Sequence, residues 1–228
     1  MNAPRLELRL YLDRLAAKAS ASHPYPVDVC AVYVVEGAVA IVEGSPIGTL
    51  GANSAFSVES EQTIRGGSMP AAVLRWELTR RAERPNLLSG DGIESRLLLA
   101  APMRFEIGGD YLLRCDRVDF PPGGEALTHI HAGAGIRCLL AGGIRIDTPA
   151  GSHRFEPLGA WFEAGPEPVY AAASATEATS FARVMILPVE YLGRSSISYV
   201  RQEDLDKPKR QSYQVFIDRP FLLPGGSE

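Results

Sequence analysis

The chain has 228 residues, enough for one large or two small domains with real cores, since 46% of its residues are hydrophobic. A net charge of −4 and a pI near 5.7 leave no basic surface of the kind that nucleic-acid binding needs. No stretch is apolar over the length of a membrane span, and the charged start MNAPRLELRLYLDRLAAK has no secretory core. We therefore expect a cytoplasmic protein with neither nucleic acid nor a membrane as partner.

Three cysteines, Cys30, Cys115 and Cys138, make an odd number without a C-x-x-C spacing. Each lies in an apolar run that reads as a strand. The sequence predicts three buried free thiols in a reducing compartment.

The chain begins with an ambiguous segment at 4–20. Leu6, Leu8 and Leu10 alternate as in a strand, whereas Leu12 and Leu15 have helical spacing. We expect a short strand that passes into a short N-terminal helix, which ends before His23 and Pro24.

From there on the pattern predicts β structure, because short apolar runs alternate with turns rich in Gly, Ser, Asn and Pro. The strands expected in the first part of the chain are 27–35, 38–42, 47–50, 55–58 and 71–78. Those expected further on are 96–100, 103–107, 111–120, 128–131, 136–140, 144–147, 152–155, 160–163, 169–172 and 180–187. Many short strands at close spacing favour an all-β sandwich or barrel.

The polar, turn-rich segment 79–92 reads as a linker between two halves. The halves resemble each other without a gap where VYVVEGAVAI at 32–41 meets RCLLAGGIRI at 137–146. A tandem duplication explains this, and chance similarity between two all-β stretches is the alternative. The domains expected are 1–85, 86–190 and a tail, 191–228, that packs on a barrel or across a dimer interface.

The main chemical feature is the pair His129 and His131, one residue apart on an expected strand. Residues i and i+2 of a strand share a face, so the two imidazoles point to the same side. Two neutral imidazoles placed in this way predict a divalent metal site, and a hydrogen-bonded or surface pair is the alternative.

These residues resemble the cupins. The first motif of that family is a glycine, five residues, H-x-H, a glutamate three or four residues on, and a closing glycine. Here Gly123, His129, His131 and Gly142 match it, and 159–170 has the length and shape of the second motif. The resemblance covers nearly the whole chain as a bicupin, and implies two tandem β-barrels (double-stranded β-helix, or jelly-roll).

The departures from the family pattern concern the metal ligands. The motif glutamate falls on Gly135 and the histidine of the second motif falls on Tyr170. In the first half, prolines 24 and 26 and Gln62 stand where histidines are expected. The resemblance therefore implies a structural N-terminal barrel and a metal site in the C-terminal barrel only.

Several side chains could complete that site. Glu163 is the best carboxylate candidate, as a third ligand or as an acid or base. Tyr170 could ligate the metal or act as acid or base, and Arg137 would orient an anionic substrate if it points inward. For each, an outward-facing side chain is the alternative; Glu125 is a weaker candidate, and Glu167 and His153 are expected outside.

The first functional hypothesis is a metal-dependent enzyme (dioxygenase, isomerase or lyase) acting on a small, anionic organic molecule. The metal would be Fe, Mn, Ni or Zn, and the two missing ligands leave open whether it binds at all. The second hypothesis is a non-catalytic protein that binds or senses a small molecule, and the third is a structural role, since one scaffold hosts many functions. The resemblance also implies a homodimer.

Overall fold

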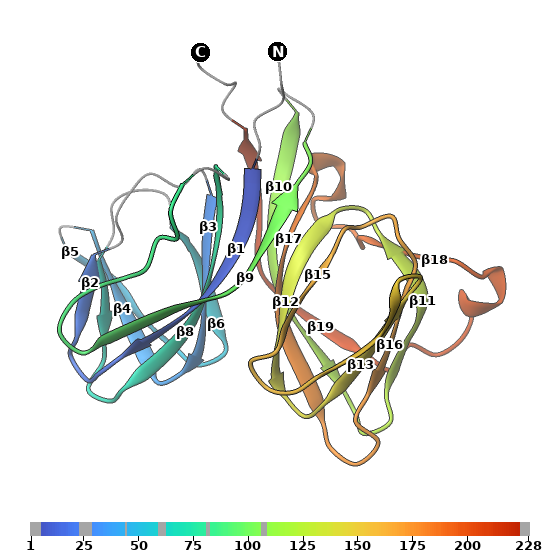
Figure 1. Ribbon diagram of the computed structural model, residues 1–228, viewed down its shortest axis with the longest axis horizontal. Coiled ribbons are helices and arrows are strands. Elements are labelled where there is room, and N and C mark those ends of the chain that lie inside the picture. Colours follow the sequence, from blue (N-terminus) through green and yellow to red (C-terminus); the bar gives the residue numbers. More distant parts are fainter. Residues whose placement is uncertain are drawn as a thin grey trace. The chain divides into compact units, whose positions relative to one another are not determined.

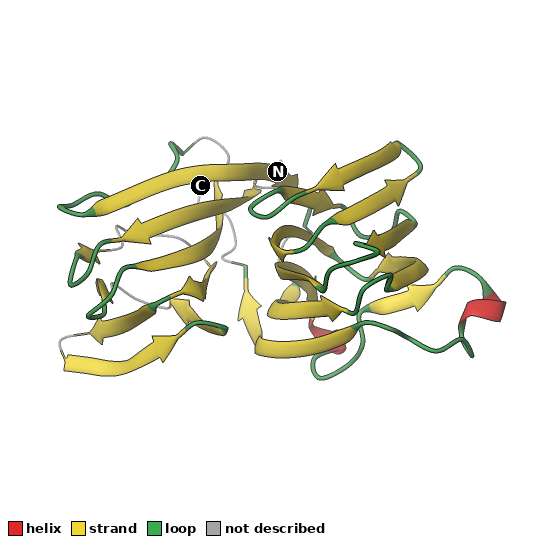
Figure 2. Ribbon diagram, turned by 90° about the horizontal axis from the view of Figure 1, so that it is seen from below, coloured by secondary structure: helices red, strands yellow, loops and turns green. Residues whose placement is uncertain are grey.

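The computed structural model describes residues 6–22, 29–43, 45–58, 63–80, 83–105 and 109–223. Within these residues the chain is almost all β (Figure 2). The strands of the first part are β1 (Leu6–Leu15), β2 (Ser20–Ser22), β3 (Val29–Glu36), β4 (Ala38–Glu43), β5 (Ser45–Gly51), β6 (Ser54–Val58), β7 (Thr63–Gly66), β8 (Ala71–Arg80) and β9 (Ile93–Met103). Those of the second part are β10 (Asp110–Phe120), β11 (Glu125–His131), β12 (Ala134–Ala141), β13 (Ile144–Thr148), β14 (Gly151–Phe155), β15 (Ala160–Glu163), β16 (Val169–Ala173), β17 (Thr179–Pro188), β18 (Ile197–Tyr199) and β19 (Ser212–Leu222). Two 3-10 turns, η1 (Val189–Tyr191) and η2 (Gln202–Asp204), are the helical elements of the described chain, and none is long and apolar enough to cross a membrane.

The prediction of an all-β fold is confirmed, but the short N-terminal helix is wrong. Residues 6–15 form one strand, β1, with β8 on one side and β9 on the other. Both faces of β1 are buried, so Leu15 can be apolar on the face opposite to Leu12, which gives these two leucines their three-residue spacing. Hydrogen bonds to two neighbouring strands outweigh that local pattern. The expected helix end at His23 and Pro24 lies outside the described residues, as do Pro26 and Gln62.

The chain forms two compact units, residues 1–108 with 223–228, and 109–222 (Figure 1). The boundary follows residue 108 rather than residue 85, because β9 pairs with β1 and belongs to the first unit. Of the strand expected at 103–107, Met103 belongs to β9, residues 104 and 105 are not in a strand, and residues 106 and 107 lie outside the described residues.

The two units share one strand order. The larger sheet of the first unit runs β6-β3-β8-β1-β9, and its counterpart in the second runs β15-β12-β17-β10-β19. The other sheets run β5-β4-β7-β2 and β14-β13-β16-β11-β18. The second unit thus repeats the first strand for strand, with β18 added at one edge.

The similarity between 32–41 and 137–146 has a structural counterpart in two hairpins. Gly37 joins β3 to β4 and Gly142 joins β12 to β13, and each has φ of +71°. A Cβ at Gly37 would lie 2.2 Å from the carbonyl oxygen of Pro70, and one at Gly142 would lie 2.6 Å from that of Ala178. Only glycine suits a left-handed turn so close to a neighbouring backbone.

The tail folds onto the second unit. β19 pairs with β10 along its length, and β18 pairs with β11, so each covers a sheet edge. The core of this unit is apolar and aromatic, with Phe120, Trp161 and Phe181 at its centre. The three cysteines are free and buried, as predicted.

Candidate functional site

The two histidines of β11 point into the second unit. His129 and His131 are 5% and 4% exposed and line a small cavity of about 20 Å³. β18 holds their strand on one side, where His129 pairs with Tyr199 and His131 with Ile197. A cavity of this size has room for about one water molecule or ion.

A backbone hydrogen bond fixes the orientation of the first imidazole. His129 Nδ1 lies 2.7 Å from the carbonyl oxygen of Leu127, so Nδ1 carries the proton and the lone pair of Nε2 points inward. That Nε2 lies 3.2 Å from Nε2 of His131. Metal-binding histidines are commonly oriented by such a bond to the ring nitrogen that does not bind the metal.

Glu163, on β15, adds a carboxylate to the pair. Its Oε2 lies 3.0 Å from Nε2 of His131, and its Oε1 accepts a hydrogen bond of 2.8 Å from the indole N–H of Trp161. Glu163 is the direct cross-strand partner of Gly135, the position on which the cupin motif glutamate falls. A Cβ at Gly135 would lie 2.3 Å from the carbonyl oxygen of Val184, so the neighbouring strand supplies the carboxylate that position 135 has no space to carry.

Arg137 also points inward and is 1% exposed. Its Nη1 donates to the carbonyl oxygen of Gly135 at 2.6 Å, and its Nη2 lies 2.7 Å from Oε2 of Glu163. The contact between Arg137 Nη2 and Glu163 Oε2 is an ion pair whose geometry is not that of a hydrogen bond. These two atoms and Nδ1 of His131 are buried and have no hydrogen-bond partner within the described chain. Buried polar atoms of this kind are rare in folded proteins and call for an explanation.

A second arginine, Arg183 on β17, completes the polar wall and was not foreseen from the sequence. It forms a two-pronged ion pair with Asp116, with N–O distances of 2.6 and 3.0 Å. The sequence offers only a weak indication of its role: Arg183 lies between Phe181 and Met185 on one face of a largely apolar strand.

Burial sets the protonation of the cluster. It lowers the pKa of His129 and lowers that of His131 to about 3, so both imidazoles are neutral at pH 7. Burial lowers the pKa of Arg137 to about 10, which still leaves it charged. Burial alone would raise the pKa of Glu163, but the charge of Arg137 and the contacts with His131 and Trp161 hold it well below its usual value.

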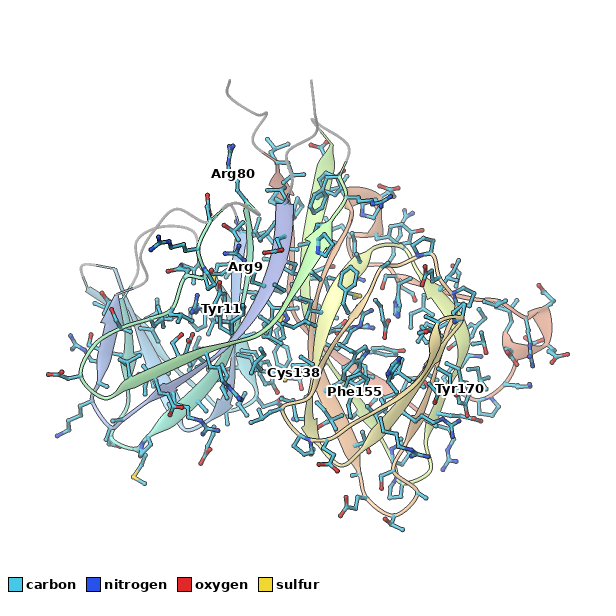
Figure 3. All side chains as sticks on the ribbon, viewed as in Figure 1. Arg9, Tyr11, Arg80, Cys138, Phe155 and Tyr170 are labelled. Carbon is cyan, nitrogen blue, oxygen red and sulfur yellow. The ribbon has the colours of Figure 1, made fainter. Side chains whose placement is uncertain are left out.

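Tyr170 is not brought to this cluster. Val169 and Ala171 line the cavity, so strand alternation turns Tyr170 to the opposite face of β16, at the outer margin of the barrel (Figure 3). There its hydroxyl donates to Oε2 of Glu125 at 2.5 Å, and this bond is the main reason why its pKa rises to about 12. Glu125 is thereby engaged on the outer face too.

The expectations for two other side chains agree with their positions. His153 and Glu167 are exposed, the former on β14 and the latter in the turn before β16.

The donor atoms suit a divalent metal ion in type and spacing. Atoms bound to one such ion at about 2.0–2.2 Å stand roughly 3 Å from each other, as the Nε2 and Oε2 atoms here do. Two imidazoles and a carboxylate are a known ligand set for iron and related metals. Among the described residues, no group of three or more His, Cys, Asp or Glu side chains has an arrangement that could hold a metal ion as it stands, and the carboxylate of Glu163 is paired with Arg137.

The interior of the first unit is polar as well, but it differs in kind. Arg75 is fully buried and pairs with Asp13, at 2.6 and 3.2 Å, and with Glu77. Its Nη2 also donates to the carbonyl oxygen of Asn86, in the segment that follows β8. No histidine lies in the described part of this unit.

No protein-family model matches the chain, and no curated protein matches it in sequence. Solved structures do match. A variant of oxalate decarboxylase from Bacillus subtilis superposes with a TM-score of 0.61 at 13% identity, over 90% of this chain and 74% of that one. AerE from Microcystis aeruginosa gives 0.57 at 16% identity, over 81% and 94% of the two chains. A conserved protein of unknown function from Pseudomonas aeruginosa, PA5104, gives 0.53 at 12% identity, over 79% and 80%.

These neighbours are all of cupin type. At such identities the likeness concerns the fold alone. The chain has the β-barrel fold of the cupins.

Proposed function

We propose that the C-terminal barrel binds one divalent metal ion through His129, His131 and Glu163, and that the protein is a metal-dependent enzyme acting on a small organic anion. The observation that carries this proposal is the convergence of two imidazole nitrogens and one carboxylate oxygen, 3.0 and 3.2 Å apart, at a buried cavity. Both imidazoles are neutral, so no proton has to leave them before a metal binds.

A metal at this position would supply Lewis-acid activation of a bound water, oxygen or enolate. Arg137 keeps Glu163 ionised and in place. Arg137 and Arg183 line the cavity as the ion-pair partners of Glu163 and Asp116, and their guanidinium groups would orient a small anionic substrate. Oxalate decarboxylase, by its name, acts on such a small anion.

The small cavity limits what can happen inside the barrel. At about 20 Å³ it excludes bulk water and has no room for an organic molecule beside an ion. A substrate must therefore be held next to this cavity or displace part of its wall. Tyr170, on the outer face, is not used.

A second function is favoured by one contact. The ion pair between Arg137 and Glu163 neutralises the carboxylate without a metal. The alternative is therefore a bicupin that binds a small anion without catalysis. A homodimer and a cytoplasmic location remain predictions of the sequence.

Metal titration separates the two functions. Untagged protein stripped with a chelator is titrated with Mn²⁺, Fe²⁺, Ni²⁺ and Zn²⁺ by calorimetry. We expect one equivalent of at least one metal to bind, binding to be lost in His129→Ala/His131→Ala, and the affinity to fall at least tenfold in Glu163→Gln.

His153→Ala is the matched control, because it removes an exposed imidazole from the same unit and should keep wild-type affinity. Absence of stoichiometric metal in the wild type would overturn the enzyme proposal and favour the binding protein.

A further inference from the structure

A larger pocket, of about 350 Å³, lies in the second unit where the tail crosses the barrel. One wall is apolar and consists of Ile197, Tyr213 and Val215. The polar wall includes Arg114, Arg183 and Arg194, of which Arg183 lies on the same sheet face as Val215. Its volume is that of a pocket for a small organic molecule.

This pocket adjoins the histidine cavity. Arg183, Ile197 and Tyr213 line both spaces and so form the partition between them. The guanidinium carbon of Arg183 lies 5.5 Å from the centre of the Tyr213 ring, which places the arginine head within the partition.

The apolar wall is unusually open to solvent. Tyr213 and Val215 are 44% and 51% exposed. On the neighbouring strand β10 their cross-strand partners are Val118 and Asp116, whose side chains point into the barrel, so Tyr213 and Val215 lie on the same face of the sheet. They therefore extend the concave, inward face of the sheet beyond the closed barrel. An apolar surface in such a recess suits the hydrocarbon part of a ligand.

The polar wall has an excess of positive charge, with three arginines against Asp116 and Asp218. Arg114 is fully engaged, by Asp218 and by the carbonyl oxygens of Tyr191 and Arg194, so it builds the rim of the pocket.

The other two arginines have free donors. Arg183 uses Nε and Nη2 on Asp116, and its Nη1 makes no hydrogen bond within the described chain. The guanidinium of Arg194 is exposed, and no described residue pairs with it.

We propose that this pocket binds an organic carboxylate with an apolar or aromatic body, the carboxylate on Arg183 and Arg194 and the body on Tyr213 and Val215. The pocket would thus hold the substrate beside the metal cavity, with Arg183 at the shared wall. Only this last link rests on the proposed function; the binding itself does not.

The test uses benzoate as the probe and benzamide as its uncharged counterpart. Both are titrated into ¹⁵N-labelled full-length protein, metal-free, and amide shifts are followed. We expect benzoate to shift the amides of 193–197 and 213–215 together, and benzamide to bind at least tenfold more weakly. Arg194→Gln should weaken benzoate binding at least threefold.

Val215→Trp fills the pocket from an exposed position and should weaken benzoate binding at least tenfold. Val200→Trp is the matched control, since Val200 is also 51% exposed but does not line the pocket, and it should bind within twofold of wild type. Thermal melting establishes that both variants are folded.

No benzoate binding to the wild type, equal binding of benzamide, or unchanged binding in a folded Val215→Trp would each overturn the proposal. Benzoate should bind His129→Ala/His131→Ala as it binds wild type. Metal binding without benzoate binding would therefore refute the pocket alone, and benzoate binding without metal binding would refute the metal site alone.

Discussion

The interiors of the two units share a strand order but use their buried polar groups differently. In the first unit Arg75 pairs with Asp13 and Glu77, and Asn86 from the following segment joins the network. In the second unit Arg183 pairs with Asp116 in the same manner. The second unit, however, also contains His129 and His131, whose Nε2 atoms lie 3.2 Å apart and beside Glu163, whereas the described part of the first unit contains no histidine.

The difference indicates which buried polar groups of each unit stabilise the fold and which can bind a ligand. A buried carboxylate paired with an arginine serves the fold, whereas a neutral buried imidazole can offer a nitrogen lone pair to a ligand. The two units thus share a strand order but differ in the side chains that point inward.

The largest effect should come from breaking the network of the first unit. Arg75→Ala leaves Asp13 and Glu77 buried without their cation, and should lower the free energy of unfolding by about 3–5 kcal/mol. Urea unfolding measures this. Arg80→Ala, at the exposed end of the same strand, should change little. Equal stability of the two variants would contradict a structural role for the network.

The next effect concerns the backbone beside the metal site. Gly135→Ala would place a Cβ 2.3 Å from the carbonyl oxygen of Val184, and should destabilise the protein by about 3 kcal/mol. Gly143→Ala is the control, because its Cβ would meet nothing closer than 3.9 Å. If Gly135→Ala or Gly135→Glu proved as stable as wild type, lack of space at position 135 would not explain why the carboxylate of the site comes from Glu163.

The effect of pH is gradual, and it is small for any change of a few tenths of a pH unit. His131 has a pKa of about 3 in the folded protein and about 6.5 when unfolded, so below pH 6.5 the unfolded chain binds a proton that the folded one does not. The unfolding free energy of metal-free protein should therefore fall with decreasing pH between 6.5 and 3, by at most about 1.4 kcal/mol per pH unit from this residue.

Comparison of variants isolates that contribution. His131→Asn should flatten the slope of stability against pH, and His153→Asn, at an exposed position, should leave it unchanged. Identical slopes in all three proteins would mean that His131 is not held neutral by burial.

The smallest effect should follow Tyr170→Phe, which removes only the hydrogen bond to Glu125 on the outer face. We expect a loss of about 1 kcal/mol and metal affinity within twofold of wild type. A large loss of metal affinity, measured by calorimetry, would place Tyr170 at the site after all.

Much of the fold follows from sequence patterns that are local. Strand alternation with turn glycines predicts most β elements, and the Gly37 and Gly142 hairpins are visible as a repeat. The error at β1 has a tertiary cause, since a strand buried on both faces can carry apolar residues on either face, as Leu12 and Leu15 do. The early domain boundary has the same origin: the pairing of β9 with β1 is a contact between distant segments.

The site was foreseen in part for similar reasons. Because i and i+2 share a face, His129, His131 and Arg137 could be placed from spacing, and Glu163 from its strand. Tyr170 was placed by motif position, which says nothing about the face of β16 on which it lies. Arg183 carries only a weak local signal, as a charged residue within an apolar strand, since its importance comes from Asp116 across the sheet.

The most direct measurement is anomalous diffraction from crystals of untagged protein soaked with Mn²⁺ or Zn²⁺, recorded on both sides of the metal absorption edge. We predict one anomalous peak per chain, within about 2.0–2.3 Å of Nε2 of His129, Nε2 of His131 and a carboxylate oxygen of Glu163. A peak elsewhere in the chain, or none with Arg137 still paired to Glu163, would contradict a metal centre in the C-terminal barrel.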